Sequence, residues 1–373
     1  MDYSISLLSL IFLLPLTLSS LPPPPNHPFS KIYAFGDSFT DTGNTHSSTG
    51  PYAFRSVSNP PYGTTFFHHP TNRYSDGRLV IDFLATALSL PFLPPYLNQS
   101  SHFSSHGVNF AVAGSTALDH EVFVKHNITL DLKRESLGTQ LGWFNGYLEE
   151  KGCGRVGSME CRSAMEGALF WVGEIGANDY AYSFGSSLSP KAIRQQAVRN
   201  VISFLQEILK KGAKHIIVQG LPLNGCLPLS LFLTPPEDRD ALGCSSSVNK
   251  LSSDHNDLLQ QKLHQLRSHH PNAIISFADY LRAHRTVVQN PKANGFVEPF
   301  KACCGAGGGQ YNFDIFNTCG SKEASAACSN PSEYVNWDGV HLTEAMYEKV
   351  AEMFFHGGYC QPSFDVFLRK QEK

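Results

Sequence analysis

An apolar segment near the N-terminus runs into a glycine, an acid and a serine: KIYAFGDSFTDTGN, residues 31–44. Residues 31–35 predict a strand, and Gly36 begins the turn that carries Ser38. Ligands of open α/β sheets bind at the carboxyl edge, so a serine there is a candidate nucleophile. If a helical turn follows Ser38, its free N–H groups would face an oxyanion formed beside the serine. A plain turn and cap is the alternative interpretation.

The rest of the chain alternates short apolar runs with longer helical patterns. The runs are continuous, as in Ile216-Ile217-Val218, which is typical of parallel strands buried on both faces. They predict one α/β/α sandwich with a central parallel sheet of about five strands. We expect strands at residues 31–35, 107–112, 168–173, 215–219 and 273–277, and helices at 79–90, 136–151, 191–211, 246–269 and 343–355. Insertions at 52–78 and 221–238 are expected to shape substrate specificity.

A second candidate motif lies near the other end of the chain, at Asp338-Gly-Val-His341. On a tight turn, this spacing can set the carboxylate against one imidazole nitrogen and leave the other nitrogen facing outward. A serine nucleophile needs such a base, because the aspartate fixes the tautomer and stabilises the imidazolium. Thr343 can cap the helix that follows.

Two further strands end in loops that carry glycine or asparagine, at residues 107–115 and 173–180. Both loops are expected on the same sheet edge as Ser38. The backbone N–H of Gly114 and the side-chain amide of Asn178 could then join the N–H of Ser38 as oxyanion donors. Ordinary turn chemistry, which also favours Gly and Asn, is the alternative.

In this order, the four blocks resemble those of the GDSL/SGNH hydrolase family, in particular its secreted esterase/lipase branch in plants. The resemblance covers about residues 30 to 360 and rests on Gly36-Asp37-Ser38, Gly107 to Gly114, Gly176-Ala-Asn178-Asp179 and Asp338-Gly-Val-His341. It implies a flavodoxin-like three-layer α/β/α sandwich.

The resemblance also implies roles for single residues. Ser38 would be the nucleophile, His341 the base and Asp338 its orienting partner, with Ser38, Gly114 and Asn178 as oxyanion donors. Two positions depart from the family pattern. Phe39 stands where the family has Leu, which we expect to affect packing more than mechanism. Ser115 stands where Ala is usual, which is expected to alter the acyl pocket.

The composition favours a small-molecule partner, and the resemblance implies that this partner is an ester substrate. A net charge of −3 and a pI near 6.6 give no reason to expect nucleic acid or an anionic membrane. Acyl transfer from an ester to such a serine needs no metal or organic cofactor. The adjacent histidines at 68–69 and 269–270 are best interpreted as solvated surface residues. Oligomeric state cannot be inferred from these features.

The N-terminus predicts export. Residues 5–18 are mostly apolar, too short to span a bilayer, and small residues follow near Ser19. We therefore divide the chain into a signal peptide (1–19), a Pro-rich segment (20–29), a hydrolase domain (30–362) and a C-terminal tail (363–373). The expected destination is the cell wall or apoplast, with the vacuole as the alternative, and no membrane insertion after cleavage.

Nine cysteines without zinc-ligand spacing indicate disulfides, with at least one thiol left over. One bridge is expected between Cys226 and Cys244, and a second group among the four cysteines at 303, 304, 319 and 328. Asn98 and Asn127 begin glycosylation triplets.

Three alternatives to a serine hydrolase remain. An acyltransferase would use the same triad with an alcohol acceptor. A binding protein could keep the fold without turnover. A metal-dependent hydrolase would be sensitive to chelators.

Overall fold

The computed structural model describes residues 29–98, 104–128, 135–153 and 157–368. The signal peptide expected at 1–19 lies outside these residues. At the centre is a six-stranded sheet with strand order β2-β1-β3-β4-β5-β8, in which β8 alone is antiparallel. Its strands are β1 (Lys31–Phe35), β2 (Gly107–Asn109), β3 (Ala168–Val172), β4 (His215–Gln219), β5 (Ile274–Ala278) and β8 (Cys360–Gln361).

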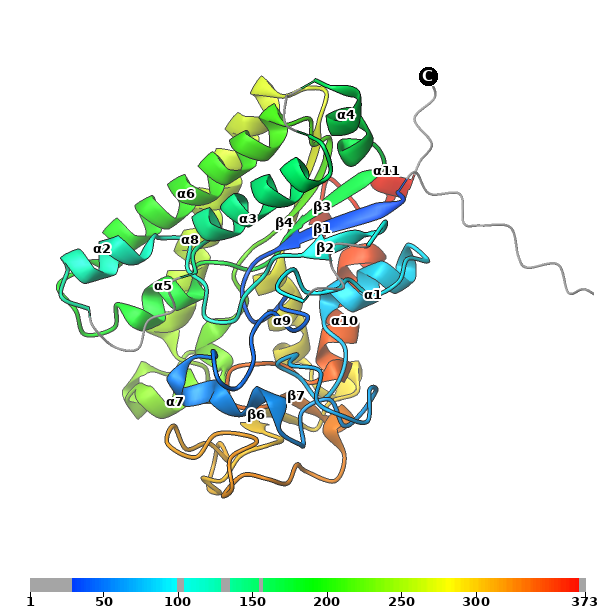
Figure 1. The fold of residues 1–373 in the computed structure, drawn as a ribbon. Helices are drawn as coiled ribbons and strands as arrows, with labels where there is room; N and C mark the ends of the chain where they lie inside the picture. The colour runs from blue at the N-terminus through cyan, green and yellow to red at the C-terminus, as the bar shows by residue number, and fades with distance from the viewer. Residues whose placement is uncertain (1–28, 99–103, 129–134, 154–156, 369–373) are drawn as a thin grey trace, which may run out of the picture.

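Helices cover both faces of this sheet and make a three-layer α/β/α sandwich, as predicted (Figure 1). One face carries α2 (His120–Lys125), α3 (Leu137–Glu150), α4 (Met159–Met165), α6 (Pro190–Lys210) and α8 (Ser246–His269). The other face carries α1 (Val80–Ala87), α9 (Tyr280–Gln289), α10 (Glu344–Phe355) and α11 (Asp365–Leu368). Alternate residues of each central strand supply the two cores, because successive side chains of a strand point to opposite faces.

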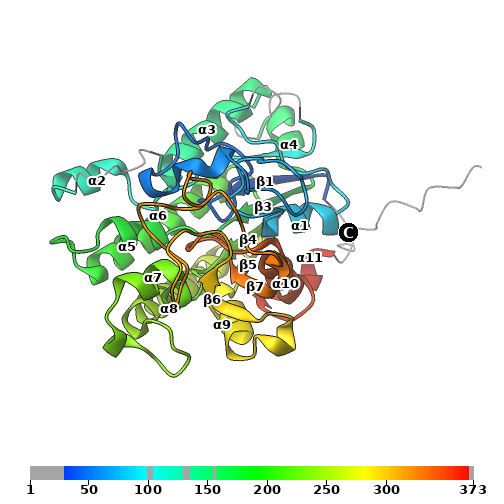
Figure 2. The same ribbon diagram turned by 90° about the horizontal axis from the view of Figure 1, so that it is seen from below.

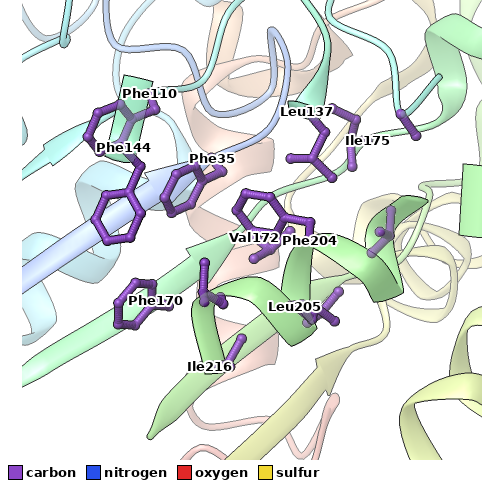
Figure 3. Packing of buried hydrophobic residues seen from close by; sticks show 14 of the residues in the cluster. Phe35, Phe110, Leu137, Phe144, Phe170, Val172, Ile175, Phe204, Leu205 and Ile216 are labelled. Atoms are coloured by element: carbon purple, nitrogen blue, oxygen red, sulfur yellow. The ribbon is translucent and has the colours of Figure 1, made fainter. Parts of the chain in front are cut away.

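Aromatic rings fill the core beneath α3 and α6 (Figure 3). The ring of Phe35 stacks on Phe110 at 5.2 Å between centroids and meets Phe204 edge-on at 4.9 Å. Phe35 is the last residue of β1, so this packing fixes the point from which the Ser38 turn leaves the sheet.

A second layer of short elements lies beyond the carboxyl edge of the sheet (Figures 1 and 2). It contains α5 (Ala177–Tyr182), α7 (Pro228–Leu233), the two-stranded sheet of β6 (Glu298–Ala302) and β7 (Tyr334–Asn336), and the 3-10 turns η1 (Tyr52–Ser58), η3 (Asn224–Cys226), η4 (Pro236–Asp238), η5 (Lys292–Asn294) and η6 (Pro331–Glu333). Both predicted insertions contribute to it.

The structure corrects two sequence expectations. The strand expected at 107–112 ends at Asn109, because the Asn109 side chain accepts from the N–H of Ala111 at 2.8 Å and bends the chain. Part of the segment expected to be a tail packs into the protein, since Phe364 and Phe367 are buried in the core beneath α10. None of the helices in the described part of the chain is both long and apolar enough to cross a membrane.

Candidate active site

Ser38 lies in a single hydrogen-bonded turn directly after β1. The N–H of Asp41 donates to the carbonyl of Asp37 at 2.9 Å, and the turn goes no further, so no helix begins at the serine. Gly36 has a φ of +140°, and a Cβ there would lie 3.2 Å from Cα of Gly173. Glycine at this position therefore allows the ends of β1 and β3 to approach each other.

The Asp338–His341 segment forms the tight turn that its spacing predicts. Asp338 Oδ1 accepts from the backbone N–H groups of Val340 at 3.0 Å and His341 at 2.8 Å. Gly339 between them has a φ of +102°, a value that L side chains rarely adopt. Thr343 caps α10 as expected.

The fold brings these two segments, 303 residues apart, into one row of hydrogen bonds. His341 Nδ1 lies 2.7 Å from Asp338 Oδ2, and Nε2 lies 2.8 Å from Ser38 Oγ. A carboxylate only accepts, so Nδ1 carries the hydrogen and Nε2 is free to accept from the serine hydroxyl. Burial disfavours the charged form of Asp338, but the adjacent His341 outweighs it and holds the pKa of Asp338 below its ordinary value.

Two tyrosines of the 52–78 insertion complete the surroundings of this pair. Tyr62 donates its hydroxyl to Asp338 Oδ2 at 2.7 Å, and the ring of Tyr74 lies 4.5 Å from that of His341. Burial and the neighbouring Asp338 raise the pKa of Tyr62 well above 10, so it remains a donor at neutral pH. Sequence reasoning missed both residues, and no local signal connects Tyr62 with an aspartate 276 positions away.

We expect Tyr62→Phe to lower kcat about tenfold, roughly 1.4 kcal/mol, because it removes a buried hydrogen bond to the Asp338 carboxylate. Tyr359→Phe is the matched control, since its hydroxyl meets Thr286 at 3.0 Å, away from Ser38. Steady-state kinetics and thermal melts of both variants measure the difference. An early-melting Tyr62→Phe with unchanged kcat at low temperature would assign Tyr62 a structural role only.

The backbone N–H groups of Ser38 and Gly114 are the predicted oxyanion donors. In the hydrogen-bond network of the described residues, the N–H groups of Ser38 and Gly114 have no acceptor, although both residues are buried. Buried N–H groups are nearly always paired, so these two are candidate donors to an anionic oxygen. Asn178 is nearby, and its Nδ2 donates at 2.9 Å to both Asp37 Oδ2 and the carbonyl of Ser115.

The two positions that depart from the family pattern have clear surroundings. Phe39 is buried, and its ring lies 5.5 Å from that of His341, so it packs beside the imidazole. The Ser115 hydroxyl accepts from Gln140 Nε2 at 3.1 Å, and the same amide donates to the carbonyl of Gly36 at 2.7 Å. The hydroxyl of Ser115 thus belongs to the same hydrogen-bond network as Gly36, at the start of the turn that follows β1.

Disulfides hold the layer around the Asp338–His341 turn. The predicted Cys226–Cys244 bridge is present, and the other group pairs as Cys303–Cys328 and Cys304–Cys319. A further bridge joins Cys153 to Cys161, and Cys360 is a buried free thiol.

The disulfide-bonded segment 303–328 contacts the segment of the Asp338–His341 turn directly. The N–H of Cys304 donates to the carbonyl of Trp337 at 2.7 Å, next to Asp338. Closing a loop of 15 residues, as Cys304–Cys319 does, contributes about 3 kcal/mol to stability. From the insertion at 221–238, the N–H of Leu229 donates to the carbonyl of Gly339 at 2.9 Å. Both contacts limit the freedom of the turn that carries His341.

Other polar features lie apart from this site. A groove of about 990 Å³ runs between α6 and α8, lined by charged side chains such as Arg199 and Asp257, and Ser38 is not part of it. Within the described ranges, no group of three or more His, Cys, Asp or Glu side chains is arranged to hold a metal ion.

A parallel-sheet α/β/α sandwich with serine, histidine and aspartate aligned at the carboxyl edge has the architecture of a hydrolase. Comparison with known proteins agrees. The family model for GDSL-like lipases/acylhydrolases matches residues 32–354. A GDSL esterase/lipase of Arabidopsis thaliana is 50% identical over 98% of this chain and 96% of its own length. Acetylajmalan esterases 2 and 1 of Rauvolfia serpentina are 42% and 44% identical, each over 87% of this chain and 89% and 85% of their own lengths.

The chain belongs to the GDSL lipase/acylhydrolase family. It is a carboxylic ester hydrolase.

Proposed function

We propose that this protein is a secreted esterase that cleaves carboxylic esters through an acyl-enzyme on Ser38. The observation that carries the proposal is the row of hydrogen bonds from Ser38 Oγ through His341 to Asp338, at 2.8 and 2.7 Å. Removal of all three side chains from bulk water strengthens these interactions.

In the proposed first half-reaction, Ser38 Oγ attacks the ester carbonyl while His341 Nε2 accepts the hydroxyl proton. The carbonyl oxygen becomes an oxyanion among the N–H groups of Ser38 and Gly114 and the amide of Asn178. The tetrahedral intermediate collapses, and His341 returns the proton to the departing alcohol. Water then attacks the acyl-enzyme by the same steps and releases the acid.

Asn178 can serve as the third donor only by sharing a hydrogen, because its two amide hydrogens already point at Asp37 and Ser115. The charge that develops on an oxyanion makes it a stronger acceptor than a neutral carbonyl. We therefore expect this interaction to form mainly as the transition state is reached, which is where it accelerates the reaction.

The alcohol part of the substrate is open to test. Two relatives are named acetylajmalan esterases, which supports including acetyl esters among the substrates tested. The test is a panel of short-acyl, long-acyl and phenolic esters, with Ser38→Ala as the blank and candidate alcohols added. Free acid as the main product supports hydrolysis, whereas a new ester would identify the acyltransferase alternative. Equal rates for the protein and the blank would contradict the proposal.

Export is part of the proposal. Four disulfides are characteristic of an oxidising compartment, and Asn98 and Asn127 are both exposed, as glycan attachment requires. For the plant-expressed protein, we expect intact mass to show loss of about 20 N-terminal residues and added glycan. The Asn98→Gln/Asn127→Gln double variant is the control for the glycan. Retained Met1 with an unmodified chain would contradict export.

A further inference from the structure

Two buried carboxyl groups lie directly behind the proposed nucleophile. Asp37 precedes Ser38 at the end of β1, and Glu174 follows β3, the neighbouring strand. Their side chains are close enough to interact electrostatically, and their exposed fractions are only 1% and 0%. The N–H of Gly173 donates to the carbonyl of Phe35 at 2.8 Å, which holds the two strand ends together.

The neighbours of this pair donate hydrogen bonds but bring no positive charge into contact. Asp37 accepts from the N–H of Phe39 at 3.0 Å and from Asn178 at 2.9 Å, while Glu174 Oε1 accepts from the N–H of Ala177 at 3.0 Å. Among the described residues, no hydrogen-bond donor reaches Glu174 Oε2. The ion pairs among the described residues include neither carboxylate.

Two carboxylates in contact and out of water cannot both be ionised, because desolvation and mutual repulsion each favour one proton on the pair. A hydrogen bond between two carboxyl groups also requires that proton, since ionised carboxylates only accept. We propose that Asp37 and Glu174 share one proton, and that this acid pair is a positioning element for the Ser38 turn and Asn178.

The inference rests on the proposed function, since it assigns the pair to the same nucleophile and oxyanion donors. Asp37 connects both: one oxygen accepts from the N–H just after Ser38, and the other accepts from Asn178. Glu174 fixes the orientation of Asp37 and, through the N–H of Ala177, the start of the short helix that carries Asn178. Holding one proton keeps a single negative charge, not two, near the oxyanion.

The charged or titratable groups that face the pair are Asp179, His341, Tyr280 and Tyr347. Burial, followed by the partner carboxyl group, raises the pKa of Asp37, and burial likewise raises that of Glu174. A raised pKa means that the pair keeps its proton to a higher pH than an ordinary carboxyl group does, and loses it as the pH rises further. We therefore expect catalysis to weaken at alkaline pH, when a second negative charge opposes the oxyanion.

Other acids near the site differ in their titration. Burial raises the pKa values of Tyr62, Tyr74 and Tyr280 well above 10, so they stay protonated over this range. Burial raises the pKa of Asp179 to about 7, which makes it the competing source of an alkaline effect. Asp179→Asn is therefore measured alongside the pair.

An infrared difference experiment tests the shared proton without using activity. A protonated, buried carboxyl group gives a C=O stretching band distinct from that of a carboxylate. We expect this band at neutral pH in Ser38→Ala and its loss in Ser38→Ala/Glu174→Gln. In the second variant the glutamine amide supplies the hydrogen-bond donor, so the pair no longer needs a protonated carboxyl group. A band that is unchanged by the second substitution would overturn the shared proton, whatever the enzyme's activity.

Kinetics test the positioning role. Glu174→Ala should lower kcat about tenfold, since a small misplacement of reacting groups has large effects on rate. Glu174→Gln should recover part of that loss and shift the alkaline fall in kcat/KM to higher pH. Glu121→Gln makes the same chemical change on an exposed carboxylate and should leave the profile unchanged.

Three results would overturn the positioning role. They are an unchanged kcat in Glu174→Ala, an alkaline fall in kcat/KM that stays at the same pH in Glu174→Gln, or an alkaline fall that shifts only in Asp179→Asn. A failure of the proposed function appears differently, as unaltered ester cleavage in Ser38→Ala.

Discussion

Ser38→Ala is expected to lower kcat by roughly 10³-fold or more while leaving the melting temperature close to that of the parent protein. The substitution removes the hydroxyl that lies 2.8 Å from His341 Nε2 and changes little else, because Ser38 contributes no side-chain bond to the core apart from this one. Without the nucleophile, only the oxyanion donors and substrate binding remain to accelerate attack by water.

A fluorophosphonate probe checks the assignment independently. Labelling should occur at Ser38 in the parent protein and disappear in the variant, as shown by peptide mass analysis. Ser186→Ala, in the loop between α5 and α6, is a control that should label and turn over normally. Probe attachment at another serine, with ester cleavage intact in Ser38→Ala, would contradict the proposed mechanism.

Asn178→Ala is expected to lower kcat by about 10²–10³-fold, roughly 3–4 kcal/mol, with little change in KM. The amide is proposed to meet the carbonyl oxygen most strongly as charge develops. Asn178→Asp keeps the size but adds a carboxylate beside Asp37 and the oxyanion, so it should be at least as inactive as the alanine variant.

Asn200→Ala separates this role from loop support. Its amide donates at 2.9 Å to the carbonyl of Ala117, in the segment that follows Gly114, so its loss affects the same loop without removing a proposed donor. We expect Asn200→Ala to melt earlier and keep its kcat at low temperature. The same behaviour in both Asn178 variants would make Asn178 structural and leave Ser38 and Gly114 as the oxyanion donors.

Local sequence was sufficient for the main elements of the fold. The boundaries of β1, β4 and α8 match the predicted ranges, because each depends on a continuous apolar run or a long amphipathic repeat between clear ends. The strand predicted at 107–112 ends three residues early, at Asn109, since a hydrogen bond to the Asn109 side chain competes with strand pairing. The antiparallel β8 has two residues and no pattern of its own, so pairing with β5 alone defines it.

Part of the proposed site could likewise be predicted from the sequence, and part could not. Gly36-Asp37-Ser38 and Asp338-Gly-Val-His341 are recognisable by spacing, because each motif folds as one tight turn with its own short-range hydrogen bonds. The sequence also predicted the serine nucleophile, its base and the order of the four motifs along the chain. It could not measure the distance between two turns 303 residues apart.

Only the tertiary structure decided which side chains support those turns. Tyr62 reaches Asp338 because an insertion folds over the carboxyl edge of the sheet, and Glu174 meets Asp37 because β1 and β3 are neighbours. Burial then gives these contacts their chemistry: it keeps Tyr62 a donor and leaves one proton on two carboxyl groups. Residue identity is local information, whereas desolvation and long-range partners exist only once the chain has packed.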